Sequence, residues 1–298
     1  MSIAWAFPGQ GSQKIGMADA VFSLKGAMER FELASEILGR DLLSICRGNA
    51  DSNNPLQDLN DTRNTQPAMF VVESLLIDDL KSQGRNPSFV AGHSLGEFVA
   101  LYAAEVFDSK TALLLLKDRS ELMALADGGA MTAVLGFDRK ELEELVANIE
   151  GVVIANDNSA DQVVLSGASE AVNLVSEKIT CKRIVPLKVS GAFHSPFMND
   201  AANSFSMKLD NVSFSNPIFP VLSNSNPTPC LDGTVVKERL KKQMTSGVRW
   251  RETMTNLEEE GVTTFVEIGP GKVLSGLAKR SMKGITLSQV SSASDLGH

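Results

Sequence analysis

The chain has 298 residues, of which 43% are hydrophobic and 21% are charged, and its formal net charge is −8. Such a composition is typical of a globular protein, and the length predicts one large domain with an insertion, or two domains. The acidic balance argues against a nucleic-acid-binding protein, because such proteins usually carry a basic surface.

The N-terminal segment and the cysteines indicate the compartment. The first apolar run, residues 3–7, is too short for a signal peptide, and no run approaches the ~18 apolar residues of a membrane helix. We therefore expect a cytoplasmic protein, or a mature form that has lost a leader. Cys46, Cys181 and Cys230 are few, odd in number and far apart. This spacing disfavours a disulfide framework or a structural zinc site and indicates free thiols.

Strands and helices alternate in the first part of the chain. Residues 3–7 predict a buried strand that ends in the loop PGQGSQ. A helix is expected over residues 64–84, with Thr65 as its cap and Pro67 in its first turn. The next expected elements are a strand at 88–92, a helix at 95–105, and a helix at about 110–126 that Ser109 caps and that stops at Gly128 and Gly129.

From residue 131 the pattern becomes strand, helix, strand, strand, helix, strand. This order is that of the ferredoxin-like arrangement, which is a compact unit. We therefore place an inserted small domain at residues 128–195, within a large domain made of residues 1–127 and 196–298. The expected elements of the insert are strands at 131–137, 151–157, 161–167 and 181–193, and helices at 138–150 and 168–180.

The last third of the chain returns to mixed helices and strands. A helix over residues 195–210 is expected to begin with Ser195 as its cap and Pro196 at its first position. Residues 291–298 are expected to be frayed. Between them the sequence predicts strands at 219–224 and 263–269, and helices at 234–244, at 250–260 and within 269–280.

The stretch GHSLGEF places Ser94 between a predicted strand and a predicted helix, with glycines two residues before and two residues after it. A nucleophile on a tight strand-to-helix turn has a strained backbone, and side chains at the flanking positions would clash. The turn exposes the hydroxyl and aims the following N–H groups toward an oxyanion. A serine that only caps a helix is the alternative, but the strand–turn–helix context favours a nucleophile.

A serine nucleophile needs a base, and the chain has three histidines, His93, His194 and His298. His93 adjoins the serine on a sharp turn, where neighbouring side chains project in different directions, and His298 is the last residue. His194, in the loop GAFHSPFM, is therefore the candidate base. An acid of the insert such as Asp157 or Asp161, or a backbone carbonyl, could orient its ring, and the sequence leaves both alternatives open.

Arg119 lies in the predicted helix 110–126, in register with the apolar face of that helix. A guanidinium on an apolar face must be paired, because an unpaired buried charge costs several kcal/mol. An internal salt bridge is one explanation. The other is a bidentate site for a substrate carboxylate, which beside an acyl-transfer serine would select a dicarboxylic acyl group.

Six motifs, spread over nearly the whole chain and in the same order, resemble those of the malonyl-CoA:acyl carrier protein transacylases. They are FPGQGSQ, NTQPA, GHSLGE, RSELM, GAFHSPFM and VEIGPGKVLSGLAKR. The resemblance implies an α/β-hydrolase-like core with a parallel sheet and an inserted ferredoxin-like small domain. It also implies transfer of a malonyl group from malonyl-CoA to the phosphopantetheine thiol of acyl carrier protein, through a malonyl-serine intermediate, in fatty acid synthesis. No cofactor and no metal are implied.

The resemblance also implies roles for single residues. Ser94 would be the acylated nucleophile, His194 its base, and Arg119 the group that binds the malonyl carboxylate. Arg249 is a departure, because some members have a glutamine there whose backbone carbonyl orients the histidine. The remaining substrate-binding residues would be Gln10 and Leu95, whose N–H groups form the oxyanion hole, and the pocket residues Gln66, Met123, Asn158 and Phe193.

The implied partners are malonyl-CoA and acyl carrier protein, with no nucleic acid and no membrane, and the chain is expected to be a monomer. Carrier proteins of this kind are acidic, so an acidic transacylase needs a local basic rim. Any single candidate can equally be a solvated surface charge. The candidates are Lys182, Arg183, Lys188, Lys241, Lys242, Arg249 and Arg251.

Three other functions stay open at this point. The first is a serine esterase or thioesterase on the same fold, from which a carboxylate-binding Arg119 would distinguish a malonyl transferase. The second is a carrier-binding protein without catalysis, which would form no malonyl adduct on Ser94. The third is an acyltransferase of polyketide synthesis, which shares the chemistry.

Overall fold

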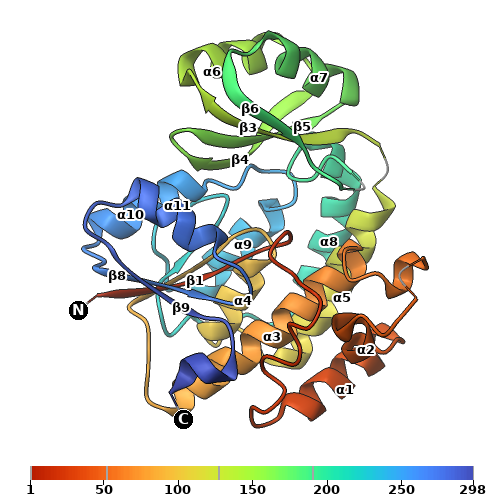
Figure 1. Ribbon diagram of the computed structural model, residues 1–298, viewed down its shortest axis with the longest axis vertical. Helices are drawn as coiled ribbons and strands as arrows, with labels where there is room; N and C mark the ends of the chain where they lie inside the picture. Colours follow the sequence, from red (N-terminus) through yellow and green to blue (C-terminus); the bar gives the residue numbers. More distant parts are fainter. Residues whose placement is uncertain (1, 52, 127, 190, 298) are drawn as a thin grey trace.

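The computed structural model describes residues 2–51, 53–126, 128–189 and 191–297. They form a parallel sheet enclosed by helices and, beside it, a smaller antiparallel sheet with helices of its own (Figure 1). The α/β class with two distinct sheets, which the sequence predicts, is confirmed. All four strands of the smaller sheet fall within the predicted insert, whose boundaries at residues 128 and 195 stay a prediction.

The large sheet consists of five parallel strands. They are β1 (Ile3–Phe7), β2 (Phe89–Gly92), β7 (Val221–Leu222), β8 (Thr264–Ile268) and β9 (Thr286–Val290). Their order across the sheet is β7-β2-β1-β8-β9. The central strands β1 and β2 are apolar along their whole length, and β8 is apolar apart from Thr264 and the buried Glu267, as expected for a parallel sheet that is buried on both faces.

Helices cover both faces of this sheet (Figure 1). On one face, Ala4 and Ala6 of β1 share a core with α10 (Trp250–Glu259) and α11 (Val273–Ser281). Trp5 and Phe7 point the opposite way, because successive side chains of a strand alternate between its faces. The helices of that second core are α1 (Ala27–Leu38), α2 (Leu42–Arg47), α3 (Thr62–Ser82), α4 (Gly96–Ala103), α5 (Ser109–Leu125), α8 (Asn199–Asp210) and α9 (Gly233–Lys242).

The small sheet confirms the predicted ferredoxin-like order of elements. Its strands are antiparallel, in the spatial order β4-β5-β3-β6, where they are β3 (Ala130–Phe137), β4 (Val152–Ser159), β5 (Gln162–Gly167) and β6 (Cys181–Pro186). Two helices, α6 (Arg139–Asn148) and α7 (Ser169–Lys178), close a separate apolar core. β6 ends at Pro186, earlier than the predicted strand 181–193.

One backbone contact ties the small sheet to the large part of the chain. Val248, just before α10, donates its N–H to the carbonyl of Ala155 at 2.7 Å and accepts the N–H of Asp157 at 2.9 Å. An ion pair between Arg251 and Asp157, at 2.8 Å, reinforces it. The small sheet is therefore held against α10 and the residues that precede it.

The start of α3 corrects the sequence prediction. The helix begins at Thr62 with Asp61 as its cap, so Thr65 and Pro67 lie inside it. Proline has no N–H for the carbonyl four residues earlier, that of Arg63. Arg40 supplies the missing donor, because its Nη2 lies 2.7 Å from that carbonyl.

Several other features differ from the prediction. The cap of α5 is Asp108, which accepts the N–H of Thr111, and not Ser109. The helices α1 and α2 and the strand β9 are not predicted by the sequence pattern. The C-terminal residues are not frayed as far as they are described, since residues 293–296 form a 3-10 turn with Leu296 buried. Predicted Ser195 capping is confirmed, by a 3-10 turn at Pro196–Met198 that leads into α8.

In the described part of the chain, no helix has both the length and the apolar character needed to span a membrane.

Candidate active site

Ser94 sits on a sharp turn between β2 and α4. Its φ is +52°, in the left-handed region that side chains rarely adopt. A Cβ on Gly92 would lie 1.8 Å from the carbonyl oxygen of Gly96, and one on Gly96 would lie 2.1 Å from that of Phe7. Only glycine fits at either position, so the two glycines of the motif make the strained turn possible.

Asn224, two residues after the end of β7, holds this turn in place. Its Oδ1 accepts the N–H of Ser94 at 2.7 Å, and its Nδ2 donates to the carbonyl of Gly92 at 2.6 Å. Asn224 is buried. None of the sequence motifs contains Asn224, and the only signal for it is its place at the end of the predicted strand 219–224.

His194 lies within hydrogen-bond reach of the serine. Its Nε2 is 2.8 Å from Oγ of Ser94, and its Nδ1 is 2.9 Å from the main-chain carbonyl of Gln243. A carbonyl can only accept, so Nδ1 carries the proton and Nε2 is free to take one from the serine. Burial, and then the nearby charge of Arg119, lower the pKa of His194 to about 3. The imidazole is therefore neutral near pH 7, as a general base must be.

A backbone carbonyl, and not an acid, orients the ring of His194. Asp157 pairs with Arg139 and Arg251, and Asp161 accepts the hydroxyl of Ser159. The carbonyl belongs to Gln243, whereas Arg249, the position suggested by the family resemblance, has a half-exposed side chain that pairs with Glu252. The departure at Arg249 thus leaves the orientation of His194 unaffected.

The other two histidines are placed differently. Nε2 of His93 is 2.8 Å from Oδ1 of Asn158, and its ring packs beside Trp250. Its ring is therefore bonded to Asn158 and not to the Ser94 hydroxyl, which is bonded to His194. His298 lies outside the described residues.

Arg119, on α5, is 1% exposed and lies at the same serine. Its Nη1 donates to Oε1 of Gln66 at 2.7 Å, and its Nη2 lies 2.9 Å from Oε1 of Gln243 and 3.2 Å from Oγ of Ser94. No carboxylate of the described residues forms an ion pair with it, so an internal salt bridge does not explain its burial. Desolvation lowers its pKa to about 10, and the group stays charged near pH 7.

A small pocket of about 90 Å³ joins these groups and opens beside an outer cleft of about 830 Å³. Asn158 is not part of its lining, because its amide is turned to His93, and Asn156 of the same strand lines it instead. The other predicted residues are all at the pocket. They are Gln10, Gln66, Ser94, Leu95, Arg119, Met123, Phe193 and His194.

Two backbone donors are available beside the serine. Within the described residues, the N–H groups of Gln10 and Leu95 have no protein acceptor. Leu95 precedes α4, and Gln10 belongs to a loop that packs on the turn, where a Cβ on Gly9 would lie 2.4 Å from the carbonyl of His93. Both N–H groups can therefore stabilise an oxyanion.

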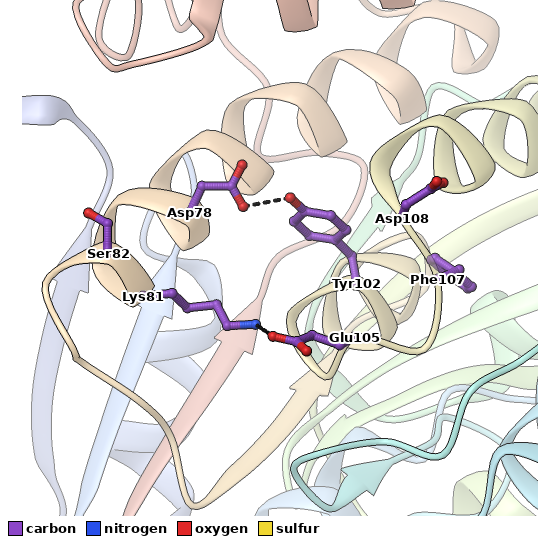
Figure 2. A pocket seen from close by; sticks show the side chains of 7 residues that line it. All are labelled: Asp78, Lys81, Ser82, Tyr102, Glu105, Phe107 and Asp108. Carbon is purple, nitrogen blue, oxygen red and sulfur yellow. Dashed lines mark hydrogen bonds and ion pairs between the residues drawn. The ribbon is translucent and has the colours of Figure 1, made fainter.

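A second hollow, between α3 and the end of α4, has a different character (Figure 2). The hydroxyl of Tyr102 donates to Asp78 at 2.5 Å, and Lys81 pairs with Glu105 (Figure 2). The charged groups Asp78, Lys81 and Glu105 thus have partners within the hollow, Asp108 caps α5, and none of the predicted site residues lies there. The pocket at Ser94 is the better candidate for catalysis.

Comparisons with known proteins agree with this geometry. The acyl transferase domain model matches residues 4–297. A malonyl CoA-acyl carrier protein transacylase from Synechocystis is 47% identical over 99% of both chains, and its crystal structure superposes with a TM-score of 0.94. A polyketide biosynthesis malonyl CoA-acyl carrier protein transacylase from Bacillus subtilis is 39% identical over 94% of this chain and 97% of its own.

A further solved structure is a malonyl-transacylase in complex with its type II polyketide acyl carrier protein. It is 34% identical, covers 99% of this chain and 98% of its own, and has a TM-score of 0.90. Over almost its whole length, the chain thus matches a single family in sequence and in structure. It belongs to the malonyl-CoA:acyl carrier protein transacylases, within the acyl transferase family.

Proposed function

We propose that the pocket at Ser94 carries out the malonyl transfer of this family, from malonyl-CoA to the phosphopantetheine thiol of acyl carrier protein. The observation that carries the proposal is the convergence of two groups, His194 and Arg119, on the Ser94 hydroxyl oxygen. Oγ of Ser94 lies 2.8 Å from Nε2 of His194 and 3.2 Å from Nη2 of Arg119. A base and a fixed positive charge at one nucleophile suit an acyl group that carries a carboxylate.

The first half-reaction acylates the serine. Oγ of Ser94 bonds to the thioester carbon as Nε2 of His194 takes the hydroxyl proton. The N–H groups of Gln10 and Leu95 stabilise the oxyanion, each worth roughly 3 kcal/mol. The C–S bond then breaks, and CoA leaves with the proton from His194. In the second half, His194 takes the proton of the carrier thiol, the thiolate attacks the ester, and the proton returns to Ser94.

Arg119 supplies the selectivity for malonyl. Its guanidinium is held by the neutral amide oxygens of Gln66 and Gln243. Its positive charge is therefore not cancelled at close range and is available to the malonyl carboxylate. Arg119→Ala should lower malonyl transfer far more than acetyl transfer. Equal losses for the two acyl groups would leave the esterase or thioesterase alternative in place.

Ion pairs within the chain reduce the number of basic residues that are free to contact the acyl carrier protein. Lys241 pairs with Asp210 and Glu238, Arg249 with Glu252, and Arg251 with Asp157. In the described part of the chain, the other candidates form no ion pair, and Lys188 lines the outer cleft. We therefore place the carrier beside this cleft, with contacts from the remaining candidates Lys182, Arg183, Lys188 and Lys242.

The decisive experiment uses malonyl-CoA alone. Incubation with the protein should add one malonyl group to Ser94, which peptide mass spectrometry would locate, and Ser94→Ala should abolish it. A missing adduct, or one that persists in the variant, would refute the proposal. Addition of acyl carrier protein should then discharge the ester.

Fatty acid synthesis is the pathway we propose, in the cytoplasm and with the enzyme as a monomer. Supply of malonyl groups to polyketide synthesis is the second candidate, because the relatives include polyketide transacylases. Rates of transfer to a fatty-acid carrier and to a polyketide carrier, measured side by side, would separate the two pathways. Light scattering would measure the oligomeric state.

A further inference from the structure

Gln243, directly after α9, contacts all three groups of the candidate site. Its main-chain carbonyl accepts a hydrogen bond from Nδ1 of His194 at 2.9 Å. Its side-chain Oε1 accepts from Nη2 of Arg119, also at 2.9 Å, and its Nε2 donates to the main-chain carbonyl of Ser94 at 2.7 Å. Gln243 is 1% exposed, so solvent does not compete for these contacts.

Glu97, in the first turn of α4, determines which way the Gln243 amide points. Its Oε2 accepts a hydrogen bond from Nε2 of Gln243 at 2.9 Å and from the N–H of Asn224 at 3.2 Å. The carboxylate of Glu97 and the carbonyl of Ser94 can only accept, so the amide nitrogen must face them. The amide oxygen is then left for Arg119. Glu97 is fully buried, and the arrangement is therefore shielded from water.

Because Gln243 is a neutral amide, it can orient Arg119 without cancelling its positive charge, which a carboxylate at this position would do. Gln66 and Gln243 both present amide oxygens to Arg119, at 2.7 Å and 2.9 Å. These bonds orient the guanidinium without neutralising it. The buried acid Glu97 interacts with Arg119 from the far side of the amide, where it raises the pKa of the guanidinium against the effect of burial. Arg119 is thus fixed in place and still able to pair with an incoming carboxylate.

We propose that the side chain of Gln243, oriented by Glu97, is a positioning residue that determines acyl selectivity. It holds Arg119 toward the acyl carboxylate, while the main chain of the same residue orients His194. This inference rests on the proposed function, because it takes Arg119 as the carboxylate-binding group. The side chain should therefore govern the preference for a carboxylated acyl group, and the main chain should govern the rate with any acyl group.

The first test is Gln243→Met, which keeps the length of the side chain and the main-chain carbonyl but removes the amide. The rate of Ser94 acylation would be measured with malonyl-CoA and with acetyl-CoA. Loss of a hydrogen bond to a charged group should lower the malonyl-to-acetyl ratio of kcat/KM by about tenfold to a hundredfold. A ratio within threefold of the parent, with both rates lowered alike, would mean a purely structural role and would overturn the proposal.

Gln243→Glu is the second test and has the same shape as the parent side chain. It would bring a carboxylate against Arg119, which would compete with the acyl carboxylate for the guanidinium. We expect the malonyl-to-acetyl ratio to fall here as well, and an unchanged ratio would overturn the proposal. Gln83→Met, at an exposed glutamine at the end of α3, is the matched control and should leave the ratio unchanged. Circular dichroism would establish that each variant is folded.

Arg119→Ala in the same assay separates this inference from the proposed function. If Arg119→Ala lowers the ratio and the Gln243 variants do not, the proposed function stands and the inference fails. If Arg119→Ala leaves the ratio unchanged, the carboxylate role of Arg119 fails and the inference fails with it. If Glu97 acts through Gln243, Glu97→Met combined with Gln243→Met should lower the ratio no further than Gln243→Met alone. If the two substitutions lower the ratio independently, so that their fold-losses multiply in the double variant, Glu97 does not act through Gln243 and is removed from the proposal.

Discussion

The amide oxygen of Asn224 lies 2.7 Å from the main-chain nitrogen of Ser94, and its amide nitrogen lies 2.6 Å from the carbonyl of Gly92. One side chain therefore joins both sides of the strained turn. The turn has a φ of +52° at the serine, a conformation that the surroundings must hold in place. Positive φ recurs at His194, at +56°, so both members of the candidate dyad carry backbone strain.

We predict that Asn224→Leu, which keeps the shape of the side chain, loosens this turn. Two buried hydrogen bonds are lost, which should lower the free energy of unfolding by about 2–4 kcal/mol. Acylation of Ser94 should slow by about tenfold to a hundredfold with malonyl-CoA and acetyl-CoA alike, because the nucleophile is misplaced for both. Urea denaturation and single-turnover acylation would measure the two effects. Asn224→Asp keeps an acceptor for Ser94 and should lose less activity; a larger loss would contradict this role.

The glycines of the turn give a second prediction. Gly96→Ala should destabilise the protein by more than about 2 kcal/mol, because the new Cβ would lie 2.1 Å from the carbonyl oxygen of Phe7. Gly276→Ala is the matched control. It lies within α11, and its Cβ would meet only the end of the Arg280 side chain at 3.7 Å. That substitution should be neutral or stabilise by up to about 1 kcal/mol. Equal effects in thermal denaturation would refute the steric argument.

The pH dependence of acylation follows from the environment of His194. Burial, and then Arg119, lower its pKa from 6.5 to about 3, and the reaction needs the neutral ring. The rate of Ser94 acylation at low malonyl-CoA, which reports the free enzyme, should thus show no acid limb near pH 6.5 and should stay level down to about pH 5. Stopped-flow acylation across pH 5–8 would measure it. A limb between pH 6 and 7 would show that His194 titrates normally.

The lowered pKa of His194 also predicts how the free energy of unfolding depends on pH. Between pH 3 and 6.5, the unfolded chain binds a proton at His194 that the folded protein does not bind. The stability that the neutral histidine contributes is therefore present above pH 6.5 and is lost as the pH falls toward 3. His194→Gln should reduce the dependence of the free energy of unfolding on pH in this window, as measured by denaturant titration.

Glu73, on α3, should make the protein less stable as the pH rises, which is opposite to the effect of His194. It is fully buried, neither of its carboxylate oxygens has a partner among the described residues, and Glu267 lies nearby. Desolvation, and then the charge of Glu267, raise its pKa well above the usual 4.5. The folded protein keeps a proton that the unfolded chain releases, so stability should fall as the pH rises above 4.5.

Glu73→Gln, which has nearly the same shape, should remove this pH dependence. Its stability relative to the parent should grow between pH 5 and pH 8 and reach about 1–3 kcal/mol at the upper end. Urea denaturation at several pH values would measure it. A variant that is less stable than the parent at pH 8 would mean that Glu73 is ionised and paired.

Features that depend on neighbouring residues could be predicted from the sequence. The turn at Ser94 needs its two glycines within a few positions, and the succession of strands and helices along the insert follows from local hydrophobic patterns. Arg119 was recognisable because its helix face is otherwise apolar. Helix α3 shows the limit, since it runs through Pro67 and the donor that Pro67 lacks comes from the side chain of Arg40, which lies outside the helix.

The sequence by itself determined the candidate nucleophile, the strained turn, the candidate base and the buried arginine, because each has a local pattern or is one of few residues of its type. Only the tertiary structure decided what holds them. Gln243 and Asn224 lie 149 and 130 positions from Ser94, and neither belongs to a local motif. They act because the fold brings the ends of α9 and β7 against one turn, where hydrogen bonds in a buried site select a single geometry.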